Sequence, residues 1–196
     1  MVRTADVSPR AAADPIGVLR WVPRLVLVLA AAALAAALVA PFGASAPVRS
    51  HVALTTLESG VLKDLNAIRA QHGLVPLHLN AQLSAAATQH SVEMGQDGYF
   101  EHTSHDGTAF WKRIAHWYGS ASYGYWSVGE NLLWSSPDVT PSGALQLWMN
   151  SPEHRANILT ARWREIGVAA VHLASAPGTY DNLPVTIVTT DFGVRR

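Results

Sequence analysis

Two histidines and one glutamate, His102, Glu130 and His154, stand in three short motifs, YFEH, VGENL and SPEHRANIL, spread along the 196-residue chain. Two imidazoles and one carboxylate form a donor set that can hold a zinc ion with an open position for water. Alternatively, Glu130 orients a histidine or accepts hydrogen bonds from helix-terminal N–H groups. The three side chains can act together only if the fold brings them to one point.

The residues before His154 predict its position on a helix. Ser151 suits the N-cap and Pro152 the first helical position, so His154 falls third, among the free N–H groups of the first turn. The positive end of the helix dipole disfavours a proton on its ring. A neutral ring can offer a nitrogen lone pair to a metal, a water molecule or a ligand hydroxyl. The alternative is a histidine that only caps the helix or packs.

Two helices are predicted ahead of the first motif. Thr55 and Glu58 have the spacing of a capping box, and apolar residues then recur at helical spacing until Gly73. Asn80 can cap a second helix, whose apolar stripe includes His90. We therefore assign His90 to the core.

A loop, a short helix and a strand follow. The stretch Tyr99–Gly107 is rich in turn formers and carries His102, and Thr108–Tyr118 has the pattern of a short helix. Aromatic and branched residues over Tyr123–Trp134 predict a strand, with a local irregularity at Gly129.

The remaining chain adds a helix and two strands. Thr140-Pro141 opens the helix, and Asn150-Ser151-Pro152 ends it. The runs Ile166–Leu173 and Val185–Phe192 are apolar enough for strands covered on both faces. Early helices, late strands and no internal repeat predict an α+β layered domain.

Aromatic residues crowd the segment His116–Trp126, HWYGSASYGYW. Such a segment can form a surface on which sugars or acyl chains stack. The alternative is that these rings pack in the core or at its rim.

Residues 1–49 differ in composition from the rest of the chain. The uncharged apolar run Leu25–Ala40 follows Arg20 and Arg24, which is typical of an export signal. Pro47 follows the best small-residue cleavage site and disfavours cleavage there, so a retained membrane anchor is the alternative. Either way, the basic residues stay on the cytoplasmic side.

Residues 50–196 are predicted to form one exported domain. Residues 1–49 hold five of the 14 basic and two of the 14 acidic residues, which leaves nine basic and 12 acidic residues and a formal charge of −3 in the domain. This balance excludes the basic footprint of a nucleic-acid-binding protein. The absence of cysteine excludes disulfides, thiolate nucleophiles and cysteine-ligated metals.

The order of the motifs resembles a known family. YFEH, VGENL, a tryptophan-bearing helix, SPEHRANIL, EIGVA and TTDFG occur in succession between about residues 57 and 193. Together they are similar to the bacterial branch of the CAP superfamily, also called SCP-like, which is related to cysteine-rich secretory and plant pathogenesis-related proteins. The resemblance implies a three-layer α-β-α sandwich with a central cleft.

The resemblance also implies a set of cleft residues. Eukaryotic members place two histidines and two glutamates in the cleft, and the matching motifs carry over His102, Glu130 and His154. The second glutamate has no match, since Asn150 and Ser151 stand at its expected place. We predict that Ser151 and Asn131 complete the ligand-binding cleft, with Asn131 expected to satisfy backbone groups around the cleft more than to touch a ligand. His102, His154 and Glu130 are the predicted ligands if Zn²⁺ or another divalent cation binds.

The function predicted from these observations is ligand binding at the cell envelope. The protein would be secreted or anchored to the outer face of the cytoplasmic membrane, and would bind a lipid, a polysaccharide or another envelope component without catalysis. The alternative is a metal-dependent, peptidase-like hydrolase in which Glu130 acts as base or ligand. No HExxH or GxSxG motif supports it. A third hypothesis is a purely structural adhesive module.

Overall fold

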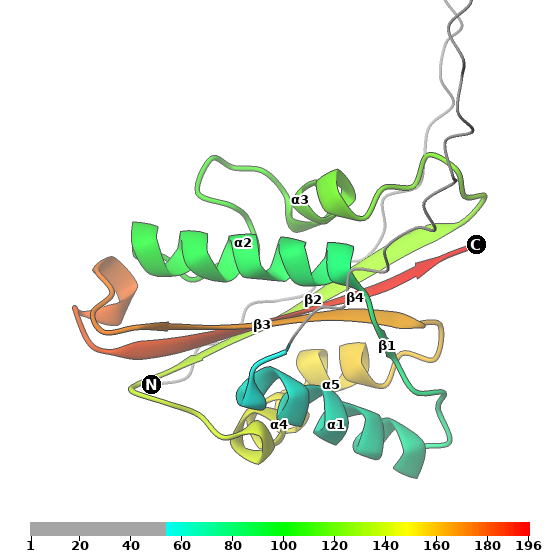
Figure 1. The fold of residues 1–196 in the computed structure, drawn as a ribbon, viewed down its shortest axis with the longest axis horizontal. Coiled ribbons are helices and arrows are strands. Elements are labelled where there is room, and N and C mark those ends of the chain that lie inside the picture. The colour runs from blue at the N-terminus through cyan, green and yellow to red at the C-terminus, as the bar shows by residue number, and fades with distance from the viewer. Residues whose placement is uncertain (1–53) are drawn as a thin grey trace, which may run out of the picture. The chain divides into compact units, whose positions relative to one another are not determined.

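The computed structural model describes residues 54–196, which form a three-layer α-β-α sandwich (Figure 1). The helices are α1 (Thr56–Gln71), α2 (Ala81–Asp97), α3 (Phe110–Trp117), α4 (Pro141–Met149) and α5 (Pro152–Ile158). A four-stranded sheet forms the middle layer, with helices α2 and α3 on one face and α1, α4 and α5 on the other. The predicted fold class is confirmed. The predicted export segment lies outside the described residues.

The sheet has the strand order β1-β3-β4-β2, so β2 forms one edge. The strands are β1 (His78–Leu79), β2 (Trp126–Ser135), β3 (Glu165–Leu173) and β4 (Val185–Arg195). β4 pairs antiparallel with β2 and β3, whereas β1 runs parallel to β3. β4 is buried from Val185 to Val194 and continues past the predicted end at Phe192. No helix in residues 54–196 has the length and apolar character needed to cross a membrane.

The predicted starts of the first two helices are confirmed by their capping hydrogen bonds. Thr55 and Glu58 form the capping box: the Thr55 hydroxyl accepts from the Glu58 amide at 3.2 Å, and the Glu58 carboxylate accepts from the Thr55 amide at 2.7 Å. The side chain of Asn80 accepts from the first amides of α2. Local sequence therefore fixes where these helices begin.

The predicted irregularity at Gly129 is wrong. The β2–β4 register is continuous from Trp126↔Arg195 to Ser135↔Thr186, so the strand has no bulge. Glycine is needed there because a Cβ atom would lie 2.6 Å from Asn157 Oδ1 and 2.9 Å from Trp163 Cζ2. The close approach of α5 and its following turn to β2, and not a bend in the strand, selects glycine.

Alternation along β2 divides its side chains between the two faces of the sheet. Leu132 packs in the cluster that contains Met94 of α2, whereas Leu133 packs in the cluster that contains helices α1 and α4. Glu130 shares the face of Leu132, and Asn131 shares the face of Leu133. The VGENL motif therefore presents its two polar side chains on opposite sides of the edge strand.

Candidate functional site

Glu130 is the centre of a buried polar network on the α2–α3 face of the sheet. It is 2% exposed, and both of its carboxylate oxygens are engaged. Oε1 lies 2.7 Å from Nδ1 of His102, and Oε2 accepts a short hydrogen bond from Nη2 of Arg113. The structure thus brings His102 and Glu130 together, although 28 positions separate them along the chain.

Glu130 stays ionised in this network. Burial alone raises the pKa of its carboxyl group, but the Arg113 charge and the hydrogen bond from His102 outweigh burial and lower the pKa to about 2. Because the ionised carboxylate only accepts, Nδ1 of His102 carries the hydrogen. In a neutral His102 ring, the lone pair therefore lies on Nε2.

Arg113 holds the loop that carries His102, and sequence reasoning missed it. Its Nη1 donates to the His102 carbonyl at 3.0 Å and to the Ser104 hydroxyl at 2.9 Å. Arg113 lies one turn after Phe110 and beside Ile114, on the inner side of α3. A charged residue within this apolar stripe was the signal that could have identified it.

His154 lies in the first turn of α5, at the position that Ser151 and Pro152 predicted. It is 2% exposed, and neither ring nitrogen has a hydrogen-bond partner within residues 54–196. Burial, followed by the charge of His102, lowers the pKa of His154 to about 4. The ring is therefore neutral at pH 7, as expected, although burial is the larger cause. That His102 and His154 share one site stays a prediction.

Asn131 lies on the face of β2 opposite Glu130, and it bonds to the backbone of His154. Its Nδ2 donates to the His154 carbonyl at 3.2 Å, and its Oδ1 accepts from Asn157 at 2.9 Å. Asn157 also donates to the backbone carbonyl of Glu130 at 3.2 Å. Asn131 is fully buried, and its bonds satisfy the His154 carbonyl and the Asn157 side chain, as expected of a residue that satisfies polar groups around the cleft. Its contact with a ligand stays a prediction.

Ser151 is the N-cap residue of α5, but its side chain does not cap the helix as expected. The Ser151 hydroxyl makes no bond to the helix amides and donates instead to Glu153 Oε2 at 3.1 Å. Ser151 is also nearly buried. It stays a predicted cleft residue, next to His154 in sequence.

Asp191 is a second buried carboxyl group that sequence reasoning missed. It pairs with Glu130 in the β2–β4 register and is 0% exposed. Neither of its oxygens has a hydrogen-bond partner of ordinary geometry within residues 54–196. Burial, and then the Glu130 charge, raises the pKa of Asp191 well above its ordinary value. An acidic residue inside the apolar run of β4 was the available signal.

The donor set does not fit the predicted metal site. In residues 54–196 no group of three or more histidine, aspartate or glutamate side chains is arranged to hold a metal ion. Glu130 has one oxygen on Arg113 and the other on His102, so coordination would require breaking a buried bond. The structure instead supports the alternative in which Glu130 orients His102.

The other histidines near the site have separate roles. His90 is fully buried, and its Nε2 lies 2.8 Å from the Glu101 carbonyl, which confirms its assignment to the core. His105 is exposed, and its backbone amide donates to Glu93. We therefore do not include His90 and His105 in the candidate site, whose histidines are His102 and His154.

Comparison with known proteins identifies the family. The family model described as the cysteine-rich secretory protein family, CAP, matches residues 62–189, which include all three motifs. The chain belongs to the CAP family. The CAP domain is also similar to an outer surface protein from Borrelia burgdorferi, at 23% identity and a TM-score of 0.53, over 69% of this chain and 90% of that one.

Other relatives are longer chains that the domain matches over part of their length. An extracellular SCP-domain protein from Bacillus anthracis is 27% identical, with a TM-score of 0.51, over 74% of this chain and 45% of that one. YkwD of Bacillus subtilis is 33% identical over 62% of this chain, and the membrane protein YlbC of the same species is 29% identical over 58%. The matches span 45% and 31% of the lengths of these two curated relatives.

Proposed function

We propose that this protein is an exported CAP-domain protein that binds an envelope component, a lipid or a glycan, at the site formed by His102, Glu130 and His154, without catalysis. The observation that carries the proposal is the unpaired ring of His154. A buried polar group without a hydrogen bond costs about 1–3 kcal/mol. A ligand hydroxyl or amide that pairs with the ring would recover this cost, which makes His154 a selective point of attachment.

The network around Glu130 supports binding in preference to catalysis. A general base needs an oxygen that can reach a proton, whereas the Glu130 oxygens are held by His102 and Arg113. The ion pair with Arg113 instead fixes the orientation and tautomer of His102. His102 retains side-chain exposure of 13%, so it can meet a ligand that approaches from solvent.

The proposed location at the envelope has support from the relatives. The solved relatives are described as an outer surface protein and an extracellular protein, and YlbC as a membrane protein. The apolar run in residues 1–49 agrees with export. Whether that segment is cleaved or retained as an anchor stays part of the proposal.

Residues 50–196 are a suitable unit for experiments. Three clusters of buried apolar residues lie within residues 54–196, so this part of the chain has its own core. The outer surface protein from Borrelia has a similar fold and is matched over 90% of its chain. Removing the apolar run also prevents non-specific insertion into lipid.

Binding to purified cell-wall glycan and to extracted envelope lipid, measured by co-sedimentation, tests the proposal. We expect one of the two fractions to retain residues 50–196, and the His102→Ala, His154→Ala double variant to lose at least tenfold in affinity. The matched control is His72→Ala, His78→Ala, which removes two exposed histidines elsewhere. Equal binding by the folded double variant and the wild type would refute the proposed site and favour a purely adhesive surface.

A further inference from the structure

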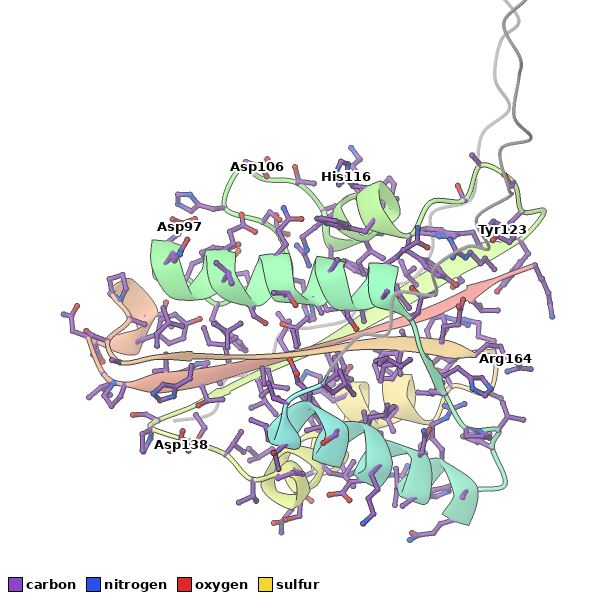
Figure 2. All side chains as sticks on the ribbon, in the orientation of Figure 1. Asp97, Asp106, His116, Tyr123, Asp138 and Arg164 are labelled. Atoms are coloured by element: carbon purple, nitrogen blue, oxygen red, sulfur yellow. The ribbon has the colours of Figure 1, made fainter. Side chains whose placement is uncertain are left out.

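A second surface of the domain combines exposed aromatic rings with arginines. We call it the aromatic–arginine surface and define it by Trp117, Tyr123, Tyr125, Arg195 and Arg196. Tyr123 is 42% exposed and Tyr125 39% exposed, and the Trp117 ring is also exposed. Figure 2 shows His116 and Tyr123, near the two ends of the aromatic segment, both on the α3 side of the sheet.

The arginines of this surface lie over tyrosine rings. The guanidinium of Arg195 lies 4.0 Å from the ring centre of Tyr118 and 4.9 Å from that of Tyr123. The Arg196 guanidinium lies 4.9 Å from the ring centre of Tyr125. Each guanidinium covers part of its tyrosine rings, which leaves less ring surface for the stacking of sugars. What the surface presents is positive charge beside amphipathic rings.

Hydrogen bonds hold Arg195 and Arg196 in this arrangement. Arg195 donates to the Gln82 side chain at 2.7 Å and to the Gly119 carbonyl at 3.4 Å. The backbones of Tyr125 and Arg196 bond to each other in both directions, at 2.9 and 3.0 Å. The segment after α3 is thereby joined to the end of β4, and Arg196 is left exposed at the margin.

The charge of this surface is opposite to that of the domain. Residues 50–196 carry a formal charge of −3, yet the segment from Ile114 to Trp126 contains no acidic residue. Lys112 precedes the segment and is exposed. Glu165 is an acidic residue close to this surface, and its carboxylate accepts a hydrogen bond from the Tyr118 hydroxyl. Basic and aromatic side chains are therefore concentrated on one part of an acidic domain.

We propose that the aromatic–arginine surface docks the domain onto the headgroup region of an anionic lipid bilayer. Arginines near an anionic leaflet are attracted by its surface potential. Tyrosine and tryptophan favour the same depth, because their rings enter the apolar boundary while their polar tips remain in water. A soluble anion would bind the arginine charges but would gain little affinity from the exposed rings. This surface shares no residue with the site of His102, Glu130 and His154.

Co-sedimentation of residues 50–196 with vesicles tests the docking surface. We expect binding to phosphatidylglycerol vesicles, little binding to phosphatidylcholine vesicles, and loss of binding in 0.5 M salt, where charges are screened within roughly 4 Å. Each arginine contributes about fivefold in affinity, so Arg195→Ala, Arg196→Ala should bind roughly 30-fold more weakly. Tyr123→Ser, Tyr125→Ser should also weaken binding.

Matched variants separate docking from net charge and from folding. Lys63→Ala, Arg155→Ala removes the same charge from exposed positions on α1 and α5, on the other face of the sheet, and should bind as the wild type does. Arg196→Glu alone tests an exposed position, in case loss of Arg195 disturbs folding. Equal vesicle binding by the two charge-matched double variants would overturn the proposal. Tighter binding of the domain to soluble polyphosphate than to vesicles would also overturn it.

Discussion

Arg113 and Glu130 form a buried ion pair between α3 and the edge strand β2, and each is almost fully shielded from solvent. The pair makes Glu130 a fixed anion, and the anion in turn orients the ring of His102. The same arginine bonds to the backbone of the loop that carries His102. The position of one site histidine therefore depends on a residue that no motif includes.

Replacing Arg113 with methionine should destabilise the domain by about 3–5 kcal/mol, because Glu130 would be left as an unpaired buried charge. Equilibrium urea unfolding of residues 50–196 measures the change. The double variant Arg113→Met, Glu130→Gln should recover part of the loss, since no buried charge remains. Lys112→Met, at the exposed neighbouring position, is the control and should change stability by less than about 0.5 kcal/mol.

The lowered pKa of His154 predicts a loss of stability in mild acid. The folded ring titrates near pH 4 and the unfolded ring near pH 6.5, so the unfolded state binds more protons between these values. Stability should therefore fall as pH falls from 6.5 to 4, by on the order of 2 kcal/mol. Urea unfolding across this range should show the slope in the wild type and a smaller slope in His154→Gln. Parallel curves for the two proteins would contradict the prediction.

The raised pKa of Asp191 predicts the opposite slope. Its folded carboxyl group holds a proton at pH values where the unfolded group, with a pKa near 3.8, has lost it. The wild type should thus lose stability, relative to Asp191→Asn, as pH rises above about 4. The asparagine is neutral and similar in shape, so the variant should fold. The difference between their unfolding free energies at pH 5, 7 and 9 measures the effect, and a constant difference would refute it.

Gly129→Ala should destabilise the domain by about 1–3 kcal/mol, because the added methyl group overlaps Asn157 and Trp163. The control is Gly124→Ala, where the nearest atom to a new Cβ is the Arg196 carbonyl oxygen at 3.9 Å. Thermal unfolding of both variants measures the contrast. A similar melting temperature for the two would show that α5 can move away from β2 at little cost.

Zinc should leave the melting temperature of residues 50–196 unchanged. A ligand present at 100 times its dissociation constant stabilises a folded protein by about 2.7 kcal/mol, which a thermal scan detects readily. Because both Glu130 oxygens are already bonded, one to His102 and one to Arg113, we predict no such shift. An increase that disappears in His154→Ala would instead restore the metal-site hypothesis.

Much of the fold could be predicted because its signals are local. The capping box at Thr55 and the Asn80 cap involve residues three positions apart or fewer, so neighbouring letters in the sequence determine them. The apolar runs of β3 and β4 reflect burial on both faces of the sheet. β1 was missed because a two-residue strand has no periodicity of its own.

The sequence by itself determined the family, the order of the helices and longer strands, and the place of His154 in the first turn of α5, since each follows from motifs or short-range spacing. Only the tertiary structure decided which groups meet: Arg113 with Glu130, Asp191 opposite Glu130, and Arg195 over Tyr118. These contacts join residues 17 or more positions apart, and their strength comes from burial. Burial depends on how the layers pack, which spacing along one chain does not encode.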